Sequence, residues 1–278
     1  MKKVLSLVLV LVLAMAALTG CGSTADNASA PAENSDMVTI KIGATPTPHA
    51  EILNALKDVL AEEGVNLEVV EYTDYVIPNT AVESGELDAN YFQHAPYLNN
   101  FNEENGTHLV SVLPVHYEPM GIFPGKSTDL AAIANGATIA VPNDTTNEAR
   151  ALQLLAAEGL ITLPADADLT ITPKDIVENP HNIQFLEVEA AAVARSLGDA
   201  DFAVINGNYA LEADLTAEQG LAFEASDSIA AQTYANVLVV KEGNENNEAI
   251  QKLEAALTSD ACRQFIEDTY KGMVLPVF

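Results

Sequence analysis

A cationic side chain stands near the start of a strongly periodic helix in the middle of the chain. The apolar strand 137–141 leads into PNDTTNEAR (142–150), where Asp144 or Thr145 is a good N-cap. Free amides at a helix N-terminus favour an anion, and a guanidinium can hold a carboxylate through two parallel hydrogen bonds. Arg150 is therefore a candidate carboxylate ligand, although a capped helix with a solvated arginine fits the spacing equally well.

Aromatic residues gather at another strand-to-helix junction. The run DANYFQHAPY (88–97) holds three aromatics and a histidine, and Tyr72 and Tyr75 follow the preceding strand, in a chain that is only 6% aromatic. A thioether sulfur gains about 0.3–1.5 kcal/mol beside an aromatic ring. The run predicts a wall for an apolar, polarisable side chain. Strand alternation leaves only one of Tyr91 and Phe92 for that wall and the other for the core.

Two asparagines stand in otherwise apolar strands. Asn206 ends the strand 202–205, and Asn236 lies inside the strand 234–240. A buried amide needs hydrogen-bond partners. A ligand is one possible partner, since an amide carbonyl accepts from an ammonium group, and a neighbouring loop is another.

Other kinds of chemistry find little support. None of the five histidines is paired at a metal-ligand spacing, and the chain has no GxSxG, GxxxxGK or HExxH motif. We therefore expect no metal, no cofactor and no catalytic residue. The formal charge of −28 argues against binding nucleic acid or anionic lipid through the protein surface.

The elements that would position these residues alternate between strand and helix. Strands are predicted at 38–42, 65–70, 88–92, 109–115, 137–141, 183–188, 202–205 and 234–240. Helices are predicted at 49–63, 76–84, 95–105, 128–135, 143–158, 189–197, 209–215 and 247–270. The alternation predicts an α/β fold of mostly parallel sheets flanked by helices. Two lobes explain it better than one wide sheet: 37–119 plus 235–278, and 120–234.

The first residues indicate export. Residues 1–20 have a basic start and an apolar run too short to span a bilayer, which is typical of a signal peptide. The ending LTGC resembles a bacterial lipobox, which implies acylation of Cys21; an ordinary exported protein with a chance cysteine is the alternative. Residues 21–36 are small and polar, and we expect a flexible linker. The protein would then be lipid-anchored to the cell membrane, outside the cytoplasm. Cys262 is left alone and is expected to pack as a small apolar residue.

Several blocks together resemble a known family. PNDTTNEAR, DANYFQHAPYL, VENP (177–180), AVINGNYAL (203–211) and YKGMVLPVF (270–278) resemble the methionine-binding lipoproteins of ABC importers, the NlpA/MetQ type. The likeness runs from Val38 to Phe278. It implies a two-lobed periplasmic-binding-protein fold, type II-like, that closes on methionine and delivers it to a permease and an ATPase.

The resemblance also implies residue roles. Arg150 would grip the α-carboxylate with Asn147 nearby, and Asn206 and Asn236 would bind the polar head of the amino acid. The side chains that would enclose the thioether are Tyr75, Phe92, His94 and Tyr97. Two departures are visible: Thr145 stands where the family often has Pro, and Ala149 where Gly is common. The segment around His49 also matches, without an assigned ligand role.

Other functions remain open from the sequence. The same fold could bind D-methionine, a methionine-containing dipeptide or another small amino acid. A surface adhesin-type lipoprotein would instead show an exposed apolar patch and no small-molecule ligand. An extracellular hydrolase would need a nucleophile with its base, and the sequence marks none.

Overall fold

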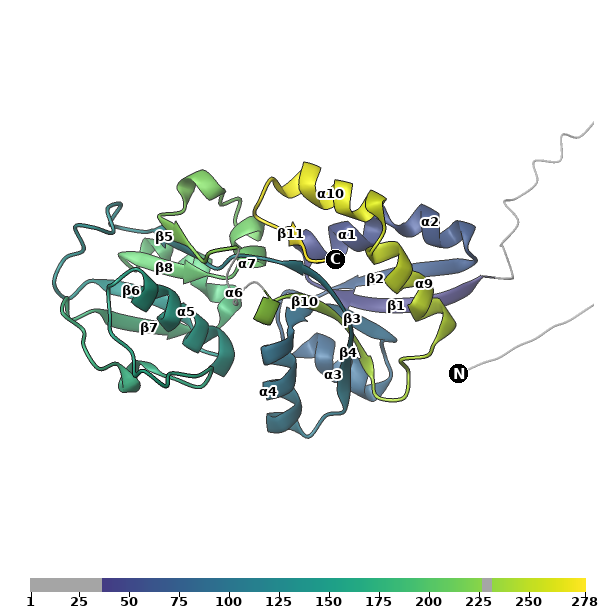
Figure 1. Cartoon of the computed structure of the whole chain (residues 1–278), viewed down its shortest axis with the longest axis horizontal. Helices are drawn as coiled ribbons and strands as arrows, with labels where there is room; N and C mark the ends of the chain where they lie inside the picture. Colours follow the sequence, from purple (N-terminus) through teal and green to yellow (C-terminus); the bar gives the residue numbers. More distant parts are fainter. Residues whose placement is uncertain (1–36, 227–231) are drawn as a thin grey trace, which may run out of the picture. The chain divides into compact units, whose positions relative to one another are not determined.

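Two mixed β-sheets flanked by helices carry the chain in this computed structural model (Figure 1). The structure describes residues 37–226 and 232–278. The predicted signal peptide 1–20, the lipidation site Cys21 and the linker 21–36 lie outside the described residues. None of the described helices is long and apolar enough to cross a membrane.

The first sheet has the strand order β11-β4-β10-β3-β1-β2. Its strands are β1 (Val38–Ala44), β2 (Val65–Glu71), β3 (Ala89–His94), β4 (Leu109–Tyr117), β10 (Asn236–Lys241) and β11 (Leu275–Pro276). Strands β1 to β4 run in one direction, and β10 and β11 run against them. The register sets Asn236 at the start of β10 opposite both His94 and His116. Three polar residues are therefore paired side by side where β3, β4 and β10 meet, at one end of these strands.

The second sheet has the order β7-β6-β8-β5-β9. Its strands are β5 (Gly121–Pro124), β6 (Thr138–Pro142), β7 (Gln184–Val188), β8 (Phe202–Ile205) and β9 (Ala222–Phe223). Strands β6, β7 and β8 are parallel, while β5 pairs antiparallel with β8 and β9. The chain passes between the sheets after β4 and again after β9. The lobe boundaries predicted at 119/120 and 234/235 agree with these passages but stay a prediction.

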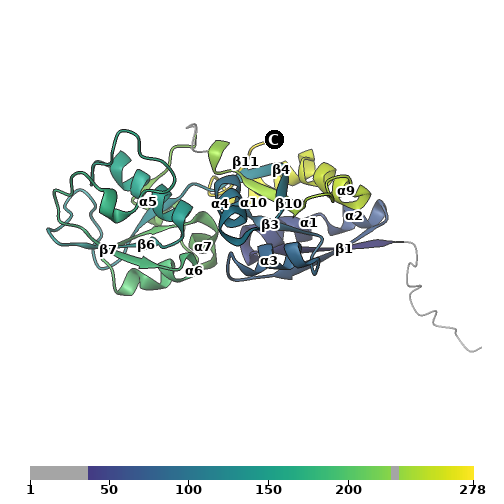
Figure 2. The ribbon, with the colours of Figure 1, turned by 90° about the horizontal axis from the view of Figure 1, so that it is seen from below.

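Helices cover both sheets. Those around the first sheet are α1 (Glu51–Ala55), α2 (Lys57–Glu62), α3 (Ile77–Ser84), α4 (Ala95–Asn105), α9 (Glu248–Leu257) and α10 (Asp260–Tyr270), with the turn η1 (Pro46–Ala50) before α1. Those around the second are α5 (Thr145–Ala157), α6 (Ala190–Val193) and α7 (Gly207–Glu212), with short turns η2 (Pro173–Asp175), η3 (Ala194–Gly198) and η4 (Ala217–Gln219). Figure 2 shows α5 and α6 on opposite faces of the second sheet.

Two helix predictions need correction. Residues 128–135 form turns instead of a helix, because the Asp129 carboxylate accepts from the Ala131 amide at 3.0 Å and competes with helical hydrogen bonding. The helix predicted at 49–63 is divided into α1 and α2. The break falls at Leu56, whose backbone (φ −98°, ψ −2°) lies at the margin of the helical region and whose amide donates to the Leu53 carbonyl at 3.1 Å. Strand β5 was also missed, because its residues were assigned to the crossing.

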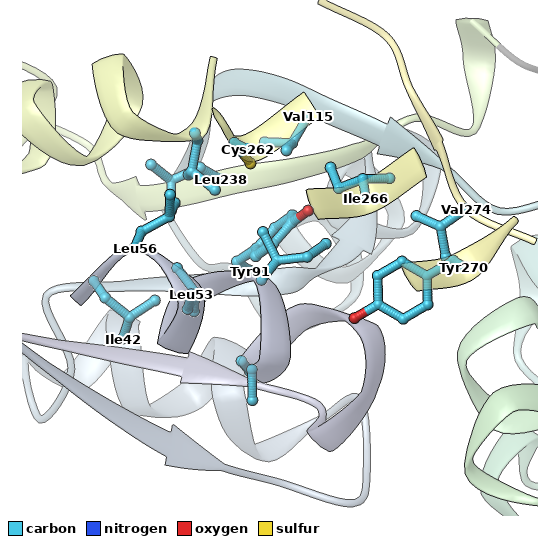
Figure 3. Close-up of a cluster of buried hydrophobic side chains, with 14 of the residues drawn as sticks. Ile42, Leu53, Leu56, Tyr91, Val115, Leu238, Cys262, Ile266, Tyr270 and Val274 are labelled. Carbon is cyan, nitrogen blue, oxygen red and sulfur yellow. The ribbon is translucent and has the colours of Figure 1, made fainter. Parts of the chain in front are cut away.

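The largest core lies under β1, β3, β4 and β10 (Figure 3). Tyr91, Leu238 and Ile266 fill its centre and are fully buried. Cys262 lies among them at 1% exposure, and burial raises the pKa of its thiol to about 11. The prediction that Cys262 packs as a small apolar residue is confirmed.

Candidate functional site

The eight residues predicted to bind a ligand all line one pocket between the two sheets. The cavity volume is about 20 Å³, enough for about one water molecule, so a larger ligand enters only if the pocket widens. The predicted residues are Tyr75, Phe92, His94, Tyr97, Asn147, Arg150, Asn206 and Asn236, and four others join them: Gln93, Glu118, Gly207 and Asn208. That these residues bind a ligand stays a prediction.

The aromatic wall comes from β3, α4 and the segment before α3. Strand β3 is buried on both faces, so its alternation sends Tyr91 into the core and Phe92 toward the pocket. The Tyr75 ring centre lies 5.6 Å from those of both Phe92 and Tyr97. Phe101 packs behind this group. The three rings make one apolar, polarisable surface.

His94 links the aromatic wall to the opposite side of the pocket. It is the N-cap of α4, where its Nδ1 accepts from the Tyr97 amide at 3.1 Å. The proton must then sit on Nε2, which donates to Asn147 Oδ1 at 3.1 Å. Burial lowers the pKa of His94 to about 4, and the Arg150 guanidinium acts in the same direction. His94 is thus a neutral hydrogen-bond donor at pH 7.

The first turns of α5 form the polar side of the pocket. Asp144 caps this helix by accepting from the Asn147 amide at 3.1 Å, as predicted. The Asn147 side chain also donates to Asp144 at 2.8 Å, and its Oδ1 accepts from Asn206 Nδ2 at 2.7 Å. Because both amides are tied down, their remaining polar atoms keep fixed directions in the pocket.

Arg150 is held by a protein carboxylate. Its Nε donates to Glu224 Oε1 at 2.8 Å and its Nη2 to Glu224 Oε2 at 2.6 Å, while Nη2 also donates to the Glu118 carbonyl at 2.8 Å. The Tyr234 ring covers the guanidinium at 4.2 Å. Glu224 thus occupies the edge formed by Nε and Nη2. That Arg150 binds a ligand carboxylate stays a prediction. Of the three guanidinium nitrogens of Arg150, only Nη1 has no hydrogen-bond partner among the described residues.

Glu118 is a buried acid at the first passage between the sheets. It is 5% exposed, and its Oε1 accepts from His116 Nε2 at 2.7 Å. The Tyr91 hydroxyl contacts His116 Nδ1, and we assign it as the donor, which leaves the ring proton on Nε2. Burial works to raise the pKa of Glu118, yet His49, His116 and the Asn208 amide outweigh it, and the pKa is lowered. Glu118 is therefore ionised.

His49 supports the same acid from the other side. Its Nδ1 lies 2.7 Å from Thr45 Oγ1, and its Nε2 lies 3.0 Å from Asn236 Oδ1 and 3.4 Å from Glu118 Oε1. Burial lowers the pKa of His49 to about 4, so the ring is neutral at pH 7. With the Thr45 hydroxyl donating to Nδ1, Nε2 carries the proton and points at Asn236 and Glu118. His49, in the segment that resembles the family, thus supports residues of the pocket wall and does not itself line the pocket.

Donor atoms of His49, His116 and Glu118 lie within 4.8 Å of one another and could together hold a metal ion. We expected no metal because the histidines are not closely spaced in the sequence, and that spacing could not reveal a group assembled by the fold. Both rings use the nitrogen that would face an ion to donate to Glu118 or Asn236. We interpret the group as a hydrogen-bonded support for the carboxylate.

Two of the four pocket residues missed from the sequence, Glu118 and Gly207, have recognisable signals. Glu118 is an acid in the segment where the chain crosses from the first sheet to the second. Gly207 begins α7, and a Cβ there would lie 2.6 Å from Glu118 Cβ and 2.9 Å from its Oε2. Only glycine lets α7 approach the acid this closely. Gln93 and Asn208 follow the predicted residues Phe92 and Asn206 within two positions and carried no signal of their own.

Two buried amide atoms of the pocket lack a partner among the described residues. They are Asn206 Oδ1 and Asn208 Nδ2, on side chains that are 6% and 2% exposed. A buried polar atom left unpaired costs about 1–3 kcal/mol. Asn206 Oδ1 is thus an acceptor available to a polar molecule beside the charges of Glu118 and Arg150, whereas the Asn208 side chain also interacts with the Glu212 carboxylate. The arrangement suits a small zwitterion with an apolar tail.

The two sides of the pocket are joined by hydrogen bonds across it. The Tyr75 hydroxyl donates to Asn208 Oδ1 at 2.6 Å, and the Tyr209 hydroxyl donates to the Thr73 carbonyl at 3.3 Å. His94 and Asn147 make a third link. Each link joins a residue near the first sheet to one near the second, so the structure is a closed arrangement.

Comparison with known proteins places the chain in a family. The sequence pattern of the NlpA lipoprotein family matches residues 40–278. The chain belongs to the NlpA lipoprotein family. This NlpA lipoprotein is 38% identical to the methionine-binding lipoprotein MetQ of Bacillus subtilis (strain 168), over 100% of this chain and 99% of that relative.

Solved structures agree with that assignment. A lipoprotein from Ruminococcus gnavus is 56% identical, with a TM-score of 0.85 over 86% of this chain and 99% of the other. A nutrient binding protein from Burkholderia cenocepacia, solved with methionine bound, is 39% identical, with a TM-score of 0.82 over 86% of this chain and 100% of the other. The predicted two-lobed binding-protein fold and the family resemblance are confirmed for this NlpA lipoprotein.

Proposed function

We propose that this NlpA lipoprotein captures methionine outside the cytoplasm and delivers it to an ABC importer. The observation that carries the proposal is one closed pocket that combines an ionised acid, an arginine and three aromatic rings. The relatives named for methionine support the choice of ligand. The proposed event is capture without chemistry, in which contacts from both lobes favour the closed form.

The polar groups suit the two ends of an amino acid. The ligand's ammonium group would lie at Glu118, with Asn206 Oδ1 as a second acceptor. One carboxylate oxygen would accept from Arg150 Nη1. The expected roles of Asn147 and Asn236 become indirect in part, since Asn147 Oδ1 already accepts from two side chains and Asn236 Oδ1 lies on His49.

The aromatic wall suits the thioether. Tyr75, Phe92 and Tyr97 surround one end of the pocket with rings at fixed distances. Sulfur beside ring edges gains about 0.3–1.5 kcal/mol per contact. His94 would position Asn147 by its hydrogen bond and add its ring face to the wall. D-methionine, a methionine dipeptide and another small amino acid remain rivals that direct competition can rank.

Membership of the lipoprotein family supports a proposal about anchoring and partners. We propose that Cys21 carries acyl chains after removal of residues 1–20. Two such chains would suffice for stable membrane attachment. The linker 21–36 would let the folded part reach a permease that works with an ATPase. Mass spectrometry of the membrane fraction tests the anchor: an unmodified Cys21 would end this part of the proposal.

Native mass spectrometry of the protein purified without added ligand tests the function. We expect a co-purifying mass equal to methionine, which leaves on denaturation. An adhesin-type lipoprotein would carry no small molecule and would gain no thermal stability from methionine. That pair of results would contradict the proposal.

A further inference from the structure

We propose that this pocket selects its ligand mainly by the ammonium group and accepts α-amino amides, in which the carboxylate is replaced by a neutral carboxamide. This inference deepens the proposed function and rests on it. It follows from how the charges around the pocket are already paired.

The cation of the pocket is neutralised before a ligand arrives. Glu224 accepts from two nitrogens of Arg150, the Tyr117 hydroxyl and the Met120 amide, at 2.6 to 2.9 Å. Both side chains are nearly buried, at 4% and 9% exposure. Glu224 itself does not line the pocket. A carboxylate that meets Arg150 Nη1 therefore meets a guanidinium whose charge is already balanced.

Among the described residues, the anion of the pocket has no permanent cation beside it. Glu118 accepts from His116 Nε2 at 2.7 Å, lies 3.4 Å from His49 Nε2, and also accepts from the Asn208 amide. No lysine or arginine is paired with Glu118 by an ion pair among the described residues. Asp144 behind Asn147 is a further acid. The charges of Arg150, Glu224 and Glu118 sum to −1.

This net negative charge makes the pocket bind the ammonium end of the ligand more strongly than the carboxylate end. A buried charge without a counter-charge is costly, so an ammonium group at Glu118 removes a penalty that the empty site carries. A carboxylate at Arg150 adds a second negative charge to a low-dielectric pocket. A carboxamide has nearly the same shape and keeps an oxygen that accepts from Nη1. Its N–H groups could also donate to the unpaired Asn206 Oδ1.

Calorimetry with three probes tests the ranking on the purified full chain after removal of bound ligand. The probes are L-methionine, L-methioninamide, and the des-amino acid in which hydrogen replaces the ammonium group. Titration at about pH 6 keeps the amines charged, since α-amino groups have pKa values of ~7.7–8.0. We expect the des-amino acid to bind at least about tenfold more weakly than methioninamide, a difference of ~1.4 kcal/mol.

Two variants assign the effect to its residues. Glu118→Gln should weaken methioninamide most and remove its advantage over the des-amino acid. Glu224→Gln should strengthen the des-amino acid relative to wild type, because the Arg150 charge is no longer balanced. Glu62→Gln on α2, an exposed acid, is the matched control and should leave the ranking unchanged.

The outcomes separate this inference from the function it rests on. If methionine binds but the des-amino acid equals or exceeds methioninamide, the inference is overturned and the function stands. If Glu118→Gln preserves the advantage of methioninamide, the assignment to Glu118 is overturned. If none of the three probes binds, the proposed function itself fails.

Discussion

The two ionic side chains of the pocket are held in different ways. Arg150 has its own acid, Glu224, in a two-bond pair, and the rings of Tyr117 and Tyr234 lie against it. Glu118 instead accepts from the His116 ring and lies beside the His49 ring, with no lysine or arginine paired to it among the described residues. Truncating either residue therefore does two things at once: it changes the contacts offered to a ligand and the burial cost of the group left behind.

Arg150→Met should weaken methionine binding and destabilise the fold. The loss leaves Glu224 buried without its cation, which costs about 3–5 kcal/mol of unfolding free energy for a broken buried pair. The double variant Arg150→Met with Glu224→Gln removes both charges and should recover most of that stability without recovering binding. Urea unfolding and calorimetry measure the two effects. A double variant that binds methionine like wild type would show that Arg150 does not contact the ligand.

Acid should destabilise the protein through its buried histidines. Burial lowers the pKa values of His49 and His94 to about 4, below the unfolded value of 6.5. The unfolded chain thus binds more protons between these values, and stability falls as pH drops from about 6.5 to about 4. His94→Gln should flatten this part of the unfolding free energy against pH, measured by urea titration. His181→Gln at the surface is the control, and an equal slope in both variants would refute the assignment.

At the scale of elements, the pocket is made by the ends of β3, β8 and β10 together with the first turns of α4, α5 and α7. Their helix starts use different caps: His94 is both a cap and a pocket residue, while Asp144 caps α5 and holds Asn147, which lines the pocket. The start of α7 is a glycine that lies against Glu118. The polar atoms of the pocket are thus positioned by the ends of strands and the first turns of helices.

Gly207→Ala should displace Glu118 and weaken methionine binding by about tenfold or more, an effect of ~1.4 kcal/mol. The added Cβ would come within 2.6 Å of Glu118 Cβ, closer than atoms can approach, so the acid or α7 must move. Gly198→Ala is the matched control, because a Cβ there meets nothing within 4 Å. Calorimetry on both variants decides. Equal affinities would mean that Glu118 does not depend on this close approach.

Sequence patterns predicted elements well where burial is periodic and poorly where contacts are distant. Alternation identified β3 and even the opposite directions of Tyr91 and Phe92. It could not show the pairing of Arg150 with Glu224, which is 74 residues away in the chain. Glu118 and its histidines likewise meet only through the register of β4, β10 and the η1 turn. The helix predicted at 128–135 failed because a single aspartate offers its neighbours a competing turn.

At the scale of the whole molecule, the pocket lies between two sheets, and hydrogen bonds among the described residues cross it. Tyr75–Asn208, His94–Asn147 and Tyr209–Thr73 are such bonds. Because a bound ligand contacts both lobes, its binding free energy adds to that of these direct hydrogen bonds and favours the closed form. The formal charge of −28 favours the approach of cationic groups over anions.

Tyr75→Phe should shorten the residence of methionine without removing the aromatic wall. The variant loses the 2.6 Å bond to Asn208, which is worth about 0.5–1.5 kcal/mol in a typical case, or roughly two- to tenfold. Most of the change should appear in the dissociation rate, because the bond exists only in the closed form. Stopped-flow release of methionine measures it. Tyr72→Phe is the control, and equal rates in both variants would exclude a role for Tyr75 in closure.

A crystal structure of the protein grown with L-methionine tests the central claim most directly. The account predicts density in the pocket between the sheets, with the ammonium nitrogen within hydrogen-bond distance of Glu118. The sulfur should lie against Tyr75, Phe92 and Tyr97. An empty pocket at saturating methionine, or methionine bound elsewhere on the molecule, would contradict the account.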